Sequence, residues 1–166
     1  MIACIGTRDP GAMPSYFGNY MAAILELGPT APIVTGAARG CDQTAAELGA
    51  RSGNTVHLVL PWWSYEAGWV AGLRLAYPAA KIYVKVYDPN VHQTWTQSVR
   101  DHHPAVHTLS RGAWALHARN FGIIEACTEV YALPSTKIGG GGTGQALRIA
   151  QRLGKKITNF NPNANW

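Results

Sequence analysis

Short apolar runs alternate along the chain with stretches in which apolar residues recur every three or four positions. Each run is followed by glycine, proline or a small polar residue, as is typical of buried parallel strands that end in ligand-facing loops. These predicted strands are residues 2–6, 31–35, 54–60 and 128–134. The predicted amphipathic helices are residues 15–27, 41–52, 112–126 and 143–153. The alternation predicts an α/β fold, with a single Rossmann-like, doubly wound, mostly parallel sheet and helices on both faces.

The middle of the chain is less regular. Residues 81–87 alternate apolar and polar side chains, which is typical of a strand with one solvated face, and we place this strand at an edge of the sheet. Residues 88–111 contain four histidines and predict a loop with a short helix that covers or extends a site. We therefore expect one domain over residues 1–160, with a variable insertion at about 64–111 and a frayed tail at 161–166.

Composition narrows the class of protein. The chain has 166 residues, the size of one domain, and its 47% hydrophobic and 14% charged residues exclude a disordered tail. Its three cysteines lie in apolar or helical patterns without metal-ligand spacing, which predicts buried thiols in a reducing compartment. Arg8 and Asp9 interrupt the first apolar run too early for a signal peptide, and no run approaches membrane-spanning length. We expect a cytoplasmic protein with no membrane partner.

Glycine-bearing loops follow the first two predicted strands. In the first loop, backbone N–H groups, the Thr7 hydroxyl and the Arg8 guanidinium follow Gly6, and all of these suit a phosphate. The second loop leads into a predicted helix whose N-terminus directs a positive dipole at a ligand. Its candidate binding residues are Thr35, Gly36, Ala37, Arg39 and Asp42. Two alternatives stay open, because Asp42 also fits a helix cap and Arg39 a surface cation.

The strongest local signal is the glycine-rich stretch after the predicted strand at 128–134. Consecutive glycines let a phosphate or a ribose lie against the backbone, immediately before a predicted helix. The candidate binding residues are Gly140, Gly141, Gly142, Thr143 and Gly144. The lysine-serine ending of an ATPase P-loop is missing, so this class of site is not expected. The alternative is a flexible turn.

Together, these motifs resemble the SLOG superfamily, the Rossmann-like group of DprA and the Lonely-guy enzymes, and in particular its small YspA-like branch. The matching stretches are GTR at 6–8, TGAARGCD at 35–42, ARN at 118–120 and GGGGTG at 139–144. The resemblance spans almost the whole chain except roughly 64–111. It implies a Rossmann-like fold, a nucleotide-type ligand and a homo-oligomer. The binding residues that it implies are Gly6, Arg8, Gly36, Arg39, Asn120, Gly140, Gly142 and Thr143.

Lonely-guy enzymes pair a helical arginine with a glutamate in PGGxGTxxE to cleave a base from a ribose 5'-phosphate. Arg119 is similar to that arginine, but Ala146 stands at the position of the glutamate. Cleavage would need another carboxylate, so Arg119, Glu66 and Glu125 form a tentative catalytic set. Asp9 and Asp42 are further candidate acids. Arg119 alternatively anchors phosphate or lies on a helix surface.

Aromatic and histidine residues add two further candidates. Trp63 follows the third predicted strand, where it could stack on a base or pack at the rim of the core. Among the histidines of 88–111, His103 and His107 have the helical spacing of a zinc pair, but the others do not. We expect no metal and no cofactor. The histidines could instead supply cations or a general acid.

Three functions follow, in rank order. The first is a sensing or sequestering module that binds a nucleotide or a nucleotide-derived ligand through the glycine loops. The second is a hydrolase or transferase, a phosphoribohydrolase-like N-glycosidase that acts on the ribosyl bond. The third is DprA-like binding of single-stranded DNA. The net charge of +5 suits any anionic ligand, but the basic residues are scattered and form no stripe interleaved with aromatics.

Overall fold

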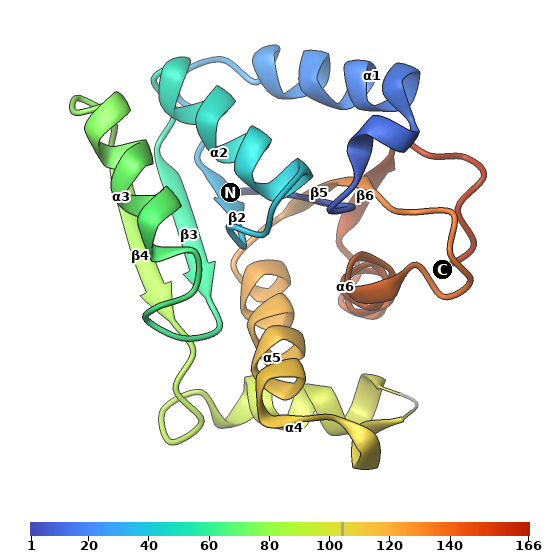
Figure 1. Ribbon diagram of the computed structural model, residues 1–166. Coiled ribbons are helices and arrows are strands. Elements are labelled where there is room, and N and C mark those ends of the chain that lie inside the picture. Colours follow the sequence, from blue (N-terminus) through green and yellow to red (C-terminus); the bar gives the residue numbers. More distant parts are fainter. Residues whose placement is uncertain (104) are drawn as a thin grey trace.

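The computed structural model describes residues 1–103 and 105–166. Within these residues lies one six-stranded sheet in the order β4-β3-β2-β1-β5-β6, and every neighbouring pair is parallel (Figure 1). The strands are β1 (Ile2–Gly6), β2 (Ile33–Thr35), β3 (Val56–Leu60), β4 (Ile82–Val86), β5 (Glu129–Leu133) and β6 (Lys156–Asn159). The predicted α/β class and parallel sheet are confirmed.

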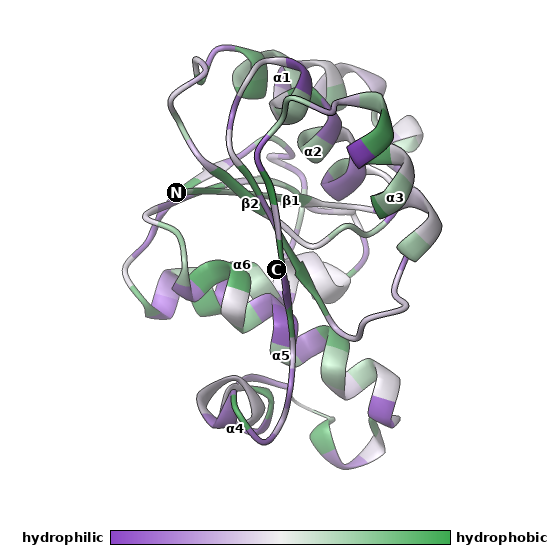
Figure 2. Ribbon diagram, turned by 90° about the vertical axis from the view of Figure 1, so that its left-hand side faces the viewer, coloured by the Kyte–Doolittle hydropathy of each residue, from purple (hydrophilic) through white to green (hydrophobic). Residues whose placement is uncertain are grey.

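Helices cover both faces of the sheet, as right-handed crossovers between parallel strands require. The α-helices are α1 (Pro14–Leu25), α2 (Cys41–Arg51), α3 (Ala67–Ala76), α4 (Gln93–His102), α5 (Arg111–Glu125) and α6 (Gly141–Arg152), with 3-10 turns at Pro10–Ala12 and Val106–Thr108. Figure 1 shows α1, α2 and α3 together on one side and α4, α5 and α6 on the other. Figure 2 shows the apolar strands running between these two layers.

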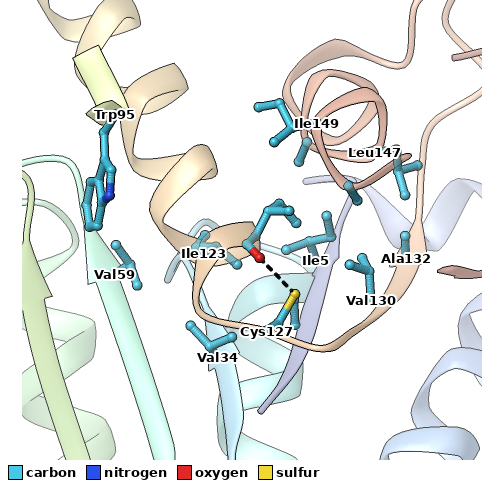
Figure 3. Packing of buried hydrophobic residues seen from close by; sticks show 14 of the residues in the cluster. Ile5, Val34, Val59, Trp95, Ile123, Cys127, Val130, Ala132, Leu147 and Ile149 are labelled. Atoms are coloured by element: carbon cyan, nitrogen blue, oxygen red, sulfur yellow. Dashed lines mark hydrogen bonds between the residues drawn. The ribbon is translucent and has the colours of Figure 1, made fainter. Parts of the chain in front are cut away.

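The core follows the strand alternation. On β1, Ala3 and Ile5 face the α5 and α6 layer, while Cys4 faces α1 and α2. Figure 3 shows the first of these clusters, in which side chains from β1, β2, β3 and β5 pack against α5 and α6. Helix α4 joins this layer through Trp95, whose indole lies where a Cβ on Gly122 of α5 would be. A glycine at 122 therefore lets the two helices approach closely.

The strand order reverses between β1 and β5. Moving outward from β1, successive strands are β2, β3 and β4 on one side and β5 and β6 on the other. The helices that follow β1 and β5 lie on opposite faces, so the loops after these two strands diverge and leave a crevice at the carboxyl edge. In such sheets ligands bind at this point. The loops concerned are the first and third glycine-bearing loops of the sequence.

Several elements differ from the sequence predictions. Helix α3 and strand β6 were not expected, whereas the helix expected within 88–111 is present as α4, over Gln93–His102. Strand β4 is an edge strand, as expected, so the segment 64–111 contributes both to the sheet and to its helical cover. Residues 161–166 are not frayed, because Asn161 is fully buried and Trp166 packs against the core.

Among the described residues, no helix is both long enough and apolar enough to span a membrane.

Candidate functional site

A pocket of about 620 Å³ opens at the carboxyl ends of β1 and β5. The loop after β1 contributes Gly6, Thr7, Arg8 and Asp9 to its lining. The loop after β5 and the start of α6 contribute residues 135–137 and 140–143. A third wall is formed by α5, from Ala113 to Asn120. The second loop adds Ala38 and Asp42, so the pocket lies at the predicted crevice and joins all three glycine-bearing loops.

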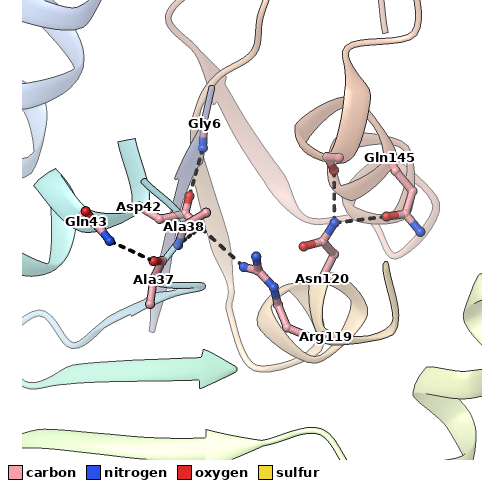
Figure 4. Close-up of polar contacts among 9 residues, drawn as sticks. Gly6, Ala37, Ala38, Asp42, Gln43, Arg119, Asn120 and Gln145 are labelled. Carbon is pink, nitrogen blue, oxygen red and sulfur yellow. Dashed lines mark hydrogen bonds and ion pairs between the residues drawn. The ribbon is translucent and has the colours of Figure 1, made fainter. Parts of the chain in front are cut away.

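An ion pair between Arg119 and Asp42 lies beneath the pocket. The Arg119 Nη1 and an Asp42 carboxylate oxygen are 3.3 Å apart, and each side chain is only 6% exposed (Figure 4). The carboxylate also accepts hydrogen bonds from the backbone N–H groups of Gly6 and Ala38, both at 3.3 Å. Burial raises the pKa of Asp42, and the Arg119 guanidinium opposes this rise. Asp42 thus joins the first two glycine loops to α5.

The second loop is shaped by this ion pair. A Cβ on Gly36 would coincide with the Arg119 guanidinium, so only glycine leaves room for the pair. Ala37 adopts a left-handed backbone, with φ at 60°, and Gly40 precedes α2 with φ at 82°. Gly40 is the N-cap of α2, and Asp42 lies in the first turn. Asp42 is therefore not the helix cap that the sequence allowed.

The third loop turns sharply before α6. Gly139, Gly140 and Gly141 have φ values of 76°, 63° and 58°, in the left-handed region that favours glycine. Helix α6 begins at Gly141, so Gly141, Gly142 and Thr143 form its first turn. N–H groups in the first turn of a helix have no partner within the helix, and these line the pocket. This geometry suits an anion such as phosphate.

Residues 161–166 support the third loop. The backbone carbonyl of Asn165 accepts a hydrogen bond from the Gly139 N–H at 2.9 Å. A Cβ on Gly140 or on Gly144 would lie 3.2 Å from the Trp166 Cβ, so the loop packs directly on this residue. The buried Asn161 amide donates to the carbonyl of Pro134 at 2.8 Å, which fixes the segment to the end of β5. Residues 161–166 therefore stabilise the glycine turn that precedes α6.

A network of side chains connects α5 with α6 beside the pocket. The Asn120 amide donates to the carbonyl of Gly142 at 3.2 Å and to the Gln145 side-chain oxygen at 3.1 Å (Figure 4). The same Gln145 oxygen lies 2.7 Å from Nδ1 of His117, which lines the pocket. Burial is the main cause that lowers the pKa of His117, and the nearby His103, Arg119 and Arg148 lower it further. Sequence reasoning missed both His117 and Gln145.

The structure brings together most of the predicted site residues. Those that line the pocket are Gly6, Thr7, Arg8, Asp42, Arg119, Asn120, Gly140, Gly141, Gly142 and Thr143. Gly36 and Gly144 lie outside the lining, where they make room for Arg119 and for the Gly139 carbonyl. Thr35 is fully buried at the end of β2. Ala37, Arg39 and Trp63 are likewise not among the lining residues.

The tentative catalytic acids do not meet Arg119. Glu66 pairs with Arg39 at 3.4 Å at the start of α3. Glu125 accepts a hydrogen bond from the Trp95 indole at 2.9 Å, at the far end of α5. Neither residue lines the pocket, whereas Ala146 and Asp9 do. In residues 1–103 and 105–166, no three histidine, cysteine or acidic side chains gather as a metal site would require.

Comparison with known proteins places this geometry in context. No protein-family model and no curated protein sequence matches the chain. DNA processing protein A from Helicobacter pylori, which binds single-stranded DNA, matches it with a TM-score of 0.63 and 21% identity, over 95% of this chain and 63% of that one. The two chains share a fold. DNA processing protein A from Streptococcus pneumoniae gives a TM-score of 0.44 and 15% identity, over 95% of this chain and 57% of that one. The chain thus spans about three fifths of the length of these structures.

Proposed function

We propose that this chain binds single-stranded DNA and that the pocket holds one phosphate of the strand. The observation that carries the proposal is the meeting of the β1 loop and the first turn of α6 at the reversal of strand order. Gly141, Gly142 and Thr143 line the pocket, and N–H groups in the first turn of a helix carry positive partial charge without a partner in the helix. The exposed Arg8 and Lys137 add full charges at the rim. The shared fold with a protein that binds single-stranded DNA supports a strand as the source of the phosphate.

Exposed aromatic rings near the pocket suit an unstacked base. A Cβ on Gly112 would lie 3.9 Å from the Trp62 indole, so this ring packs beside the start of α5, where the next residue, Ala113, lines the pocket. Trp63 follows directly and is 77% exposed. Stacking on an aromatic side chain is worth about 1–3 kcal/mol per base and tolerates any sequence. A strand anchored at the pocket could therefore continue along α5 toward Trp63.

A free nucleotide is the second candidate, with the chain as a sensing or sequestering module. A pocket of about 620 Å³ lies within the range of small-molecule sites. Among the described lining residues, the exposed cations are Arg8 and Lys137. Proteins that bind single-stranded nucleic acid follow its phosphate backbone with a positively charged groove, and these two cations alone do not form such a groove. The sequence alone ranks this candidate first, but the likeness to a protein that binds single-stranded DNA reverses the order.

Cleavage of a nucleotide has weaker support. The Asp42 carboxylate is paired with Arg119, and Glu66 and Glu125 have partners elsewhere. Asp9 is the remaining acid in the described lining, and it is exposed at the rim, away from the buried Arg119. Arg119 accordingly acts as a structural cation beneath the pocket in this proposal, with no catalytic role.

Salt dependence separates a strand from a free nucleotide. We would titrate the chain with fluorescent oligothymidylates of increasing length and with AMP, at several salt concentrations. Binding of a strand should tighten with length and weaken steeply with salt, because counterions are released. Arg8→Ala and Lys137→Ala should each lower the slope of log affinity against log salt by about 0.7. Arg51→Ala, which removes an exposed cation at the opposite end of α2, is the matched control.

Each result of these titrations supports or contradicts one of the two candidate functions. Affinity that is independent of oligonucleotide length, together with tight AMP binding, would favour the free-nucleotide module. Binding that is equally reduced by Arg51→Ala would indicate a diffuse basic surface and contradict the pocket as the binding site. No binding of either probe would refute both candidates.

A further inference from the structure

The hydrogen bonds between α5 and α6 determine the protonation pattern of His117. A backbone carbonyl only accepts hydrogen bonds, so the Asn120 atom that contacts Gly142 must be the amide nitrogen. This nitrogen also contacts Gln145, so the Gln145 atom there must be the amide oxygen. The oxygen accepts, and Nδ1 of His117, at 2.7 Å from it, must therefore carry a proton. A neutral His117 then has an unprotonated Nε2.

The surroundings of His117 favour this neutral form. The ring of His103, which follows α4, lies with its centroid 4.4 Å from that of His117. Burial is the main cause that lowers the pKa of His117, and His103 together with the cations Arg119 on α5 and Arg148 on α6 lowers it further. Of the groups that act on this pKa, Gln145 alone raises it, through its hydrogen bond. At neutral pH the residue is an acceptor at Nε2 and a donor at Nδ1.

We propose that His117 is a ligand-recognition residue whose Nε2 accepts a hydrogen bond from an N–H or O–H group of the nucleotide in the pocket. The proposal rests on the proposed function and adds a specific contact to it. Its basis is that His117 lines the pocket while its Nδ1 is engaged with α6. The network starts at the carbonyl of Gly142, in the turn proposed to bind phosphate. Phosphate binding and recognition by His117 therefore depend on one set of hydrogen bonds.

The pH dependence of affinity gives opposite signs for two roles of His117. If Nε2 accepts a hydrogen bond, protonation removes its lone pair, and affinity for a labelled oligothymidylate should fall as the pH is lowered from 8 to 5. If His117 served only as a cation for phosphate, affinity should rise over the same range. A flat or rising profile would overturn the proposal. Probe binding with such a profile would leave the proposed function intact.

Substitution of His117 supplies the matched variants. In His117→Asn the side-chain amide can still donate to Gln145, but its carbonyl oxygen lies closer to the backbone than Nε2 and leaves the place of Nε2 without an acceptor. Affinity at pH 8 should drop about threefold to tenfold, the value of one hydrogen bond, and the pH dependence should vanish. His57→Asn, on β3 away from the pocket, should leave both properties unchanged. Unchanged affinity and pH profile in His117→Asn would contradict the contact.

Gln145→Glu tests the network itself. A carboxylate beside Nδ1 favours protonated His117, so the fall in affinity should shift to higher pH. If the glutamate prevents folding, ¹⁵N NMR of the unaltered chain decides the protonation pattern, because it separates the two neutral tautomers. The expected signal is a protonated Nδ1, and a protonated Nε2 at neutral pH would overturn the proposal. No probe binding at any pH would end both this contact and the proposed function.

Discussion

Arg119 and Asp42 form a buried ion pair at 3.3 Å although they come from helices on opposite faces of the sheet. Each charge is compensated mainly by the other, so removal of one leaves an unpaired charge in the interior. We expect Arg119→Ala and Asp42→Ala each to lower the free energy of unfolding by about 3–5 kcal/mol. Urea denaturation monitored by circular dichroism measures the free energy of unfolding of each variant.

The double variant provides the control for the pair. With both charges gone, no unpaired ion remains, so the loss should be smaller than the sum of the two single losses by more than about 1 kcal/mol. Strictly additive losses would contradict a coupled pair.

Gly36 makes the ion pair possible, and its substitution should be costly. In Gly36→Ala the new methyl group would occupy the place of the Arg119 guanidinium, so the pair must separate. The expected loss is about 2–4 kcal/mol, since part of the ion pair and some packing are disturbed. Gly18→Ala is the control, because it lies within α1 with open space around it and should be neutral or stabilising by about 0.5–1 kcal/mol. Equal effects of the two substitutions would exclude this explanation.

Gly142 is the position at which ligand binding can be separated from folding. A Cβ there would meet only the Asn120 amide, at 3.6 Å, and the backbone is not left-handed, so the fold tolerates a side chain. In Gly142→Val the branched side chain should fill space at the first turn of α6 and weaken nucleotide or oligonucleotide binding at least about tenfold. Calorimetric titration of the variant, with its thermal unfolding measured alongside, checks this. Unchanged affinity would refute the phosphate turn.

The stability of the chain should depend on the protonation of His117. Burial holds its pKa below the ordinary value of 6.5, so the unfolded chain binds the proton more readily than the folded chain. Stability is then fully present above about pH 6.5 and decreases as the pH falls toward the lowered pKa. His117→Asn should flatten this part of the curve. Because burial lowers the pKa of His57 in the same way, His57→Asn should remove a separate share of the slope. Urea midpoints between pH 5 and 8 measure both.

Trp166 supports the third glycine loop from outside the pocket. Its replacement by alanine removes the indole that packs against the core. We expect a moderate loss of stability, about 1–3 kcal/mol, and a further loss of ligand affinity because the turn at Gly140 is less well held. Affinity measured well below the unfolding temperature separates the two effects. Full affinity in the folded variant would show that the turn holds its shape without this support.

Some helices and strands can be predicted from the sequence because their residues form a clear pattern, and others cannot. The central strands are apolar on both faces, so each can be predicted from a short run of apolar residues. Strand β6 is only Lys156–Asn159, with a single strongly apolar residue, Ile157, and leaves almost no pattern. Helix α3 contains two glycines, and its N-cap residue, Glu66, has φ at 50° and makes no side-chain cap hydrogen bond, so neither propensity nor a usual cap marks the helix.

Part of the candidate site can likewise be predicted from the sequence, and part of it cannot. Glycine loops are visible in the sequence because the backbone itself forms the site. The partnership of His117 with Gln145 depends on how α5 packs on α6, and the two residues are 28 positions apart. A histidine three residues before Asn120 on one helical face was the available signal, since both side chains then point toward the same neighbour.

The pairing of β1 with β5 has a kinetic consequence. Ile2–Gly6 form a strand between β2 and β5, and Glu129–Leu133 emerge only after most of the chain has been synthesised. Until then one apolar edge of β1 lacks its partner, and such edges favour wrong pairing between chains. Contacts between residues so distant in sequence also slow folding. Competence to bind a ligand is therefore acquired last, so a ligand present during refolding would stabilise the final state without accelerating the early steps.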